Sequence, residues 1–252
     1  MSKDAEQIKK LLEIVEYMLQ NGADPEIKDN EGQSPYSLAK NTILKKLFDG
    51  YLSYNKDFQA LLDEEEMTDL KIKNTKCHKM IVEMRTGKKA EELQEFFTKK
   101  TNEELKLFLD WAYGKSVDFT DVTLFKELGI DEPHKRHLRL DLPKLFEDES
   151  SKDFTLLVHN EKIKVHKLIL YARSELFKGM FQATMETEQV QDYTNKSVKT
   201  LQALVKYLYT DMLDESIEDP QILEELKDAN DYYQLNPKSM MTYWIEKRET
   251  YN

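Results

Sequence analysis

The sequence predicts an α+β fold that is rich in helix, and three observations lead to this class. Residues 154–165 alternate apolar and polar side chains on either side of a polar turn, which predicts a β-hairpin. Segments before and after it repeat apolar residues every three to four positions, the pattern of amphipathic helices. Only seven glycines and six prolines occur in 252 residues, which favours helices over long loops.

The hairpin is expected to turn at His159–Lys162, and helices should follow it. The first should carry four apolar residues on one face: Leu168, Ile169, Ala172 and Leu176. Ser174 can cap a second, short helix, and Ser197 can cap a third. The third should also have an apolar face: Leu201, Leu204, Val205 and Leu208.

The region from Asp153 to Thr210 resembles the BTB/POZ domain. The resemblance rests on residues in the family's order and spacing: Asp153–Leu156, Val165–Lys167, Ala172–Ser174, Phe177, Met180–Phe181 and Tyr207–Thr210. In this family such residues brace the fold and line the self-association face. The resemblance therefore implies a structural rather than a catalytic role for a polar cluster: Asp153, His166, Lys167 and Arg173.

The N-terminal segment resembles an ankyrin repeat junction. Residues 8–20 predict an amphipathic helix, and Ser34 and Pro35 should cap and open another. Residues 34–39 stand where the family carries Thr-Pro-Leu-His-x-Ala, with Ser37 in place of the histidine. About one and a half repeats fit, too few to bury their own core. We therefore expect this segment to pack against the helix predicted at 41–66 and the unit that follows.

Residues 57–130 look like a degenerate copy of the BTB/POZ-like stretch. His78–Lys79 matches His166–Lys167, and Trp111 and Tyr113 match Tyr207 and Tyr209. The predicted organisation has five parts: an ankyrin-like segment at 1–50, a degenerate BTB/POZ-like unit at 51–130, a linker at 131–140, a BTB/POZ domain at 141–236 and a C-terminal helix at 237–252.

Composition excludes several partners. The net charge of −11 makes the chain a poor non-specific ligand for nucleic acid, whose binding depends on neutralising phosphates. No apolar run approaches the about 20 residues of a membrane span. The single cysteine, Cys77, allows no intrachain disulfide, and the first residues lack the apolar core of a secretory signal. A soluble protein of the cytoplasm or nucleus is expected.

No motif for catalysis, cofactor or metal binding stands out. Cys77 and His78 are adjacent, but neighbours on a strand point to opposite faces and cannot act together. His134 and His137 have no third ligand nearby at a metal-site spacing. There is no Walker-type or dinucleotide-binding glycine loop. We expect a protein that is not an enzyme and that binds no cofactor.

The whole layout resembles the ankyrin repeat and BTB/POZ domain-containing proteins. This resemblance implies an adaptor that recruits substrates to a cullin-3 ubiquitin ligase. The alternative is an oligomerisation scaffold, as in transcriptional or cytoskeletal BTB proteins, with no ligase role. The two BTB/POZ-like units are expected to form a pseudo-dimer within one chain, because a short linker gives an effective concentration in the millimolar range. The competing arrangement is a homodimer through the second unit.

The resemblance also implies a partner-binding segment. Family members that bind cullin-3 carry a hydrophobic residue, any residue and then Glu after the Met-Phe of the central helix. Here Met185 takes the hydrophobic position, but Thr187 stands at the Glu position, with a carboxylate on each side of it. Met185 could instead cover the domain's own core edge. The expected partner-binding residues are Met185, Glu186, Glu188 and Tyr209.

Overall fold

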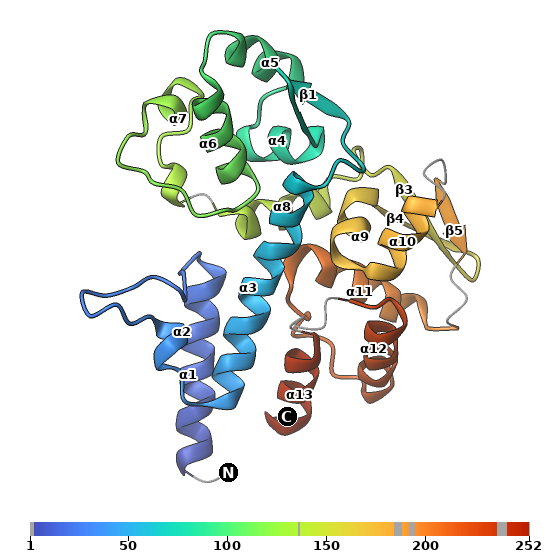
Figure 1. Ribbon diagram of the computed structural model, residues 1–252. Helices are drawn as coiled ribbons and strands as arrows, with labels where there is room; N and C mark the ends of the chain where they lie inside the picture. The colour runs from blue at the N-terminus through green and yellow to red at the C-terminus, as the bar shows by residue number, and fades with distance from the viewer. Residues whose placement is uncertain (1–2, 136, 184–187, 192–194, 236–240, 252) are drawn as a thin grey trace. The chain divides into compact units, whose positions relative to one another are not determined.

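The fold is α+β and helix-rich, as the sequence predicts (Figure 1). The computed structural model describes residues 3–135, 137–183, 188–191, 195–235 and 241–251. These residues form helices and two small sheets, one with two strands and one with three. No helix among them combines the length and the apolar composition that a membrane crossing requires.

The chain divides into two compact units. The terminal unit comprises Met1–Tyr54 and Asp148–Asn252, and the central unit comprises Asn55–Glu147. One long helix, α3 (Thr42–Asp63), begins in the terminal unit and ends in the central unit.

The terminal unit contains a three-stranded sheet and seven helices besides the first part of α3, among the residues described. Its elements in chain order are α1 (Lys3–Gln20), α2 (Pro35–Leu38), β3 (Phe154–Val158), β4 (Glu161–Val165), α9 (Lys167–Arg173), α10 (Glu175–Ala183), β5 (Gln189–Gln191), α11 (Val198–Thr210), α12 (Pro220–Tyr232) and α13 (Met241–Tyr251).

The predicted hairpin is present as β3 and β4. Its register pairs Phe154 with Val165 and Val158 with Glu161. The turn is therefore only His159–Asn160, shorter than the predicted turn that extended to Lys162, because the polar Glu161 and Lys162 lie in the strand. His159 has a φ of 53°, which a tight turn requires. A third strand, β5, runs parallel to β3, and the sequence pattern did not indicate it.

The helices that follow the hairpin begin as predicted and divide differently. Ser174 has extended backbone angles, so α9 ends at Arg173 and Leu176 belongs to the next helix, not to the predicted common face. The Ser174 hydroxyl accepts the backbone N–H of Phe177, which confirms its capping role. Ser197 caps α11, whose four predicted apolar residues are all buried.

The N-terminal segment packs against the helix predicted at 41–66, where the Tyr36 hydroxyl donates to the Asp49 carboxylate at 2.8 Å, but its second partner differs from the prediction. Residues 1–54 group with 148–252 rather than with the first BTB/POZ-like unit. The partners come from the end of the chain: Tyr243 and Lys247 of α13 both donate to the Glu16 carboxylate. Ser34 caps α2 as predicted, and Ser37 completes a capping box with it. Leu38, in the segment that was predicted to pack against other elements, is 55% exposed.

The central unit also contains a hairpin. Its elements in chain order are the C-terminal part of α3, β1 (Leu70–Ile72), β2 (Thr75–Cys77), α4 (Lys79–Thr86), α5 (Ala90–Thr98), α6 (Asn102–Ala112), α7 (Thr123–Glu127), a 3-10 turn (Pro133–Lys135) and α8 (Leu138–Glu147). Residues 131–147 had been divided between a linker and the second unit. They belong here because Asp141 of α8 forms a buried ion pair with Arg85 of α4.

Candidate interaction site

A histidine and a tyrosine link the hairpin of the terminal unit to its helices. His166 precedes α9, and Tyr209 lies near the end of α11. The Tyr209 hydroxyl accepts the His166 backbone N–H at 2.8 Å and lies 2.7 Å from its Nδ1. Because that hydroxyl already accepts one hydrogen bond, its own proton is available for Nδ1. The imidazole proton is then on Nε2, which lies 2.9 Å from the Ser151 hydroxyl.

This arrangement holds the imidazole neutral. Burial lowers the pKa of His166 from 6.5 to about 4, because the charged form loses its hydration. Burial also raises the pKa of Tyr209 well above its usual value. Neither group is therefore ionised near neutral pH, and the pair acts as a structural hydrogen bond rather than as an acid–base couple.

Asp153 and Lys167 meet through the backbone. The Asp153 carboxylate accepts the backbone N–H of Lys167 at 2.7 Å, which satisfies a free N–H in the first turn of α9. The Lys167 ammonium lies 4.8 Å from the centre of the Phe181 ring, a cation–π distance. Both predicted residues therefore brace the junction between β4 and α9.

Arg173 forms a different contact and does not join the other three residues. Its guanidinium donates to the Asp211 carboxylate at 2.6 Å, and both side chains are buried. It also lies 4.6 Å from the centre of the Tyr54 ring. Sequence reasoning missed Asp211, although a buried arginine requires an acidic partner. The indole N–H of Trp244 donates to the Asp211 carbonyl, so α13 is fixed at the same place.

The predicted partner-binding residues divide into two groups. Tyr209 is fully buried and its carbonyl accepts the Tyr54 hydroxyl, so it is a core residue and presents no surface to a partner. Glu188 is exposed, and its carbonyl accepts the Thr155 N–H at 3.0 Å where β5 begins. Met185 and Glu186 lie outside the described residues.

The central unit repeats the His–Tyr and Asp–Lys contacts and has a buried Arg–Asp pair of its own, whose Asp141 lies in α8. The Tyr113 hydroxyl accepts the His78 backbone N–H at 2.8 Å and lies 2.7 Å from Nδ1, the same distances as in the other pair. Asp69 accepts the backbone N–H of Lys79 at 2.7 Å. Arg85 pairs with Asp141 and lies 4.1 Å from the Trp111 ring centre. Burial lowers the pKa of His78 as well.

The other candidates for chemistry do not form a reactive site. Cys77 is buried, which raises the pKa of its thiol to about 12, so the nucleophilic thiolate does not form near neutral pH. His78, its neighbour, is engaged with Tyr113. Among the described residues, no group of three or more His, Cys, Asp or Glu side chains could hold a metal ion, and His134 and His137 join none.

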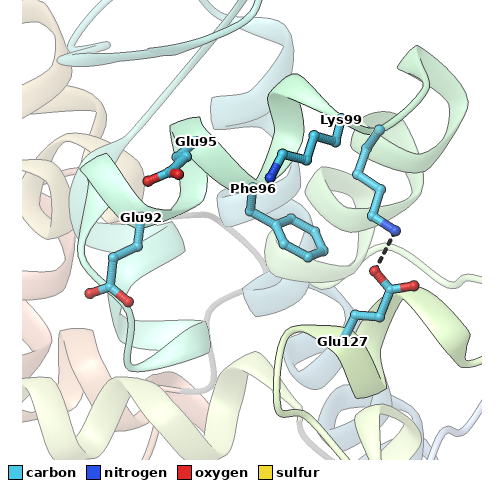
Figure 2. Close-up of a pocket in the computed structure, with 6 residues that line it drawn as sticks. Glu92, Glu95, Phe96, Lys99 and Glu127 are labelled. Carbon is cyan, nitrogen blue, oxygen red and sulfur yellow. Dashed lines mark hydrogen bonds and ion pairs between the residues drawn. The ribbon is translucent and has the colours of Figure 1, made fainter.

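A shallow pocket lies between α5 and α7 (Figure 2). Six residues line a hollow of about 510 Å³: Glu92, Glu95, Phe96, Lys99, Lys100 and Glu127. The Phe96 ring projects into it, and Lys100 pairs with Glu127 at 2.5 Å while lying 5.2 Å from the Phe96 ring centre. The pocket offers charges that largely cancel and no nucleophile, so it does not indicate catalysis.

The terminal unit is therefore a small α+β domain whose hairpin and helices are joined by buried polar contacts. Residues 142–243 match the model of the BTB/POZ domain, so this part of the chain is a BTB/POZ domain. Such domains mediate protein–protein interaction and self-association and are not enzymes. The chain is also similar to BTB/POZ and MATH domain-containing protein 4 of Arabidopsis thaliana, with 37% identity over 75 residues. That similarity covers 29% of this chain and only 16% of the relative.

Two solved BTB domains are among the structures to which part of the chain is similar. The BTB domain of zebrafish PATZ1 is 23% identical, with a TM-score of 0.33, and the match covers 43% of this chain and 81% of that one. The BTB domain of human gigaxonin is 21% identical, with a TM-score of 0.35, and the match covers 41% and 85%.

Proposed function

We propose that the protein is a non-catalytic adaptor that recruits client proteins to a cullin-3 ubiquitin ligase. The observation that carries the proposal is the BTB/POZ match over residues 142–243, since this domain is a protein-interaction module. The Arabidopsis relative supports an adaptor role because its name pairs a BTB/POZ domain with a second kind of domain.

The proposed contact with cullin-3 is the segment from Met185 to Glu188. Met185 would enter a hydrophobic groove of the cullin, where an unbranched side chain adapts well. Cullin-binding family members carry a glutamate where this chain has Thr187. Glu186 or Glu188 would supply the carboxylate instead. Glu188 is suited to this because it is exposed, while its backbone is tied to β3.

Calorimetry with the cullin-3 N-terminal domain tests this contact. We expect Met185→Ala to weaken binding by about 1–3 kcal/mol, the cost of truncating a hot-spot residue. Leu38→Ala is the control, because Leu38 is exposed on α2 of the same unit, and this variant should bind like the wild type. No heat of binding for the wild type at tens of micromolar would refute the ligase role.

We also propose that the central unit is a second, degenerate BTB/POZ-like unit, and that the two units form a pseudo-dimer within the chain. The matching His–Tyr and Asp–Lys contacts of the two units support the duplication. The resemblance of residues 34–39 to an ankyrin motif likewise supports an ankyrin-like role for the first 50 residues. Light scattering should give a monomer, and a dimer that persists on dilution would contradict the pseudo-dimer.

The second candidate function is an oligomerisation scaffold without a ligase role, in transcription or the cytoskeleton. The observation that favours it is Thr187 at the position where cullin-binding relatives carry Glu. In either role we place the protein in the cytoplasm or nucleus, since its single cysteine requires no oxidising compartment. Imaging of a tagged protein tests the location.

A further inference from the structure

An apolar stripe runs along the outer side of α1. Of the seven large hydrophobic side chains that are exposed among the described residues, four belong to this helix: Leu11, Ile14, Tyr17 and Met18. Their exposed fractions lie between 49% and 66%. Single exposed apolar residues are ordinary, whereas a contiguous group indicates an interaction surface.

Helix geometry makes the four side chains contiguous. Successive residues lie about 100° apart around a helix, so positions 11, 14 and 18 share one face and position 17 borders it. The stripe spans about two turns, roughly 10 Å along the axis. We define the α1 stripe as Leu11, Ile14, Tyr17 and Met18.

The opposite face of α1 is firmly anchored. Leu12, Glu16 and Leu19 are all buried there. Glu16 accepts hydrogen bonds from Tyr243 and forms an ion pair with Lys247 at 2.6 Å. The stripe is therefore presented on a fixed helix, and substitutions in it leave these buried contacts in place.

The charge around the stripe indicates what kind of partner it accepts. Between Glu6 and Glu31 the chain carries seven carboxylates and three lysines. Of these, Glu16 is buried, and Lys10 borders the stripe but is paired with Glu6 at 3.1 Å. Glu13 lies exposed on α1, and the loop after the helix exposes four more acidic residues: Asp24, Glu26, Asp29 and Glu31. Two copies of the chain would bring these like charges together, which disfavours self-association through the stripe.

We infer that the α1 stripe is a docking surface for an amphipathic helix of a partner protein, one with basic residues beside its apolar face. A helix fits because the stripe is straight and two turns long, and apolar side chains at i, i+3, i+4 and i+7 would lie along it. Lysine or arginine beside that face would meet the surrounding carboxylates. This assignment rests on the proposed adaptor function, in which the stripe is the client-binding surface.

Fluorescence anisotropy with two labelled peptides tests the inference. Each peptide is a helix of about 20 residues with leucine at i, i+3, i+4 and i+7, and the flanking positions are all lysine in one and all glutamate in the other. The full-length protein should bind the lysine peptide with a Kd in the tens of micromolar, because a surface of four side chains is small. It should bind the glutamate peptide at least about tenfold more weakly.

Variants of the protein then locate the binding. The double variant Ile14→Gln/Tyr17→Gln should bind the lysine peptide at least about tenfold more weakly than the wild type. The matched control is Tyr232→Gln, since Tyr232 is a tyrosine on α12, outside the stripe, with an exposed fraction of 48%. It should bind like the wild type. Leu11→Gln is a second stripe variant, and thermal melts of all variants should match that of the wild type.

Three outcomes would overturn the inference. The first is that the double variant binds the lysine peptide as tightly as the wild type does. The second is that the wild type binds the lysine and glutamate peptides equally. The third is that the wild type forms a dimer that the double variant does not form. Calorimetry with the cullin-3 N-terminal domain separates this inference from the proposed function. If the lysine peptide binds at the stripe while cullin-3 does not bind, the ligase role fails and the docking surface stands.

Discussion

Acidification should destabilise the terminal unit through His166. The pKa of this histidine is about 4 in the folded protein and 6.5 when exposed, because burial disfavours the imidazolium. Between these values the unfolded chain binds a proton that the folded chain does not. Stability is therefore complete above pH 6.5 and falls as the pH decreases towards 4. Protonation also removes the acceptor at Nδ1 that faces the Tyr209 hydroxyl.

The size of the effect follows from the two pKa values. Linkage gives a loss of about 2 kcal/mol between pH 7 and pH 5, and screening by solvent reduces this to about 1–2 kcal/mol. The pKa of His78 is lowered for the same reason, so the central unit should respond in the same direction.

Urea unfolding at pH 7 and pH 5 measures this loss. In His166→Asn the amide oxygen stands near the position of Nδ1 and does not titrate, so the loss should shrink by about 1–2 kcal/mol. His159→Asn is the matched control, because His159 is exposed in the hairpin turn and should retain the wild-type dependence. If the free energy of unfolding falls equally between pH 7 and pH 5 in the wild type and in His166→Asn, the reasoning is refuted.

Three further predictions concern the buried contacts. Arg173→Ala should destabilise the protein by about 3–5 kcal/mol in urea unfolding, because it leaves the Asp211 carboxylate buried without its ion pair. Lys206→Ala breaks the half-exposed pair with Asp214 and should cost at most about 1 kcal/mol in the same assay. Residues 1–50 alone should show no cooperative thermal transition by circular dichroism, since the partners of Glu16 lie in α13, and a melt near that of the full chain would contradict this. Cys77 should react with a thiol reagent on the order of 100-fold more slowly in the native than in the urea-unfolded protein, and equal rates would show that the thiol is accessible.

Local pattern was enough for the elements themselves. The alternation from Phe154 to Val165 predicted the hairpin, because period-2 alternation matches a strand with one buried face. Ser34, Ser174 and Ser197 were all correctly predicted as caps, since a cap depends on the few residues beside it. The failures at this level were also local: Leu176 was assigned to the wrong helix because the extended backbone of Ser174 has no signature in apolar spacing.

Partners distant in sequence could be decided only by the tertiary structure. Nothing in the sequence pattern joins Arg173 to Asp211, or Glu16 to Tyr243 and Lys247, because pairing between helices depends on how they pack rather than on spacing. Tyr209 was expected at a partner surface, yet the chain brings His166 and Tyr54 onto it and buries it completely. The sequence alone therefore determined which segments fold and which residue types need partners. Packing decided which residues meet, and it left the α1 stripe exposed.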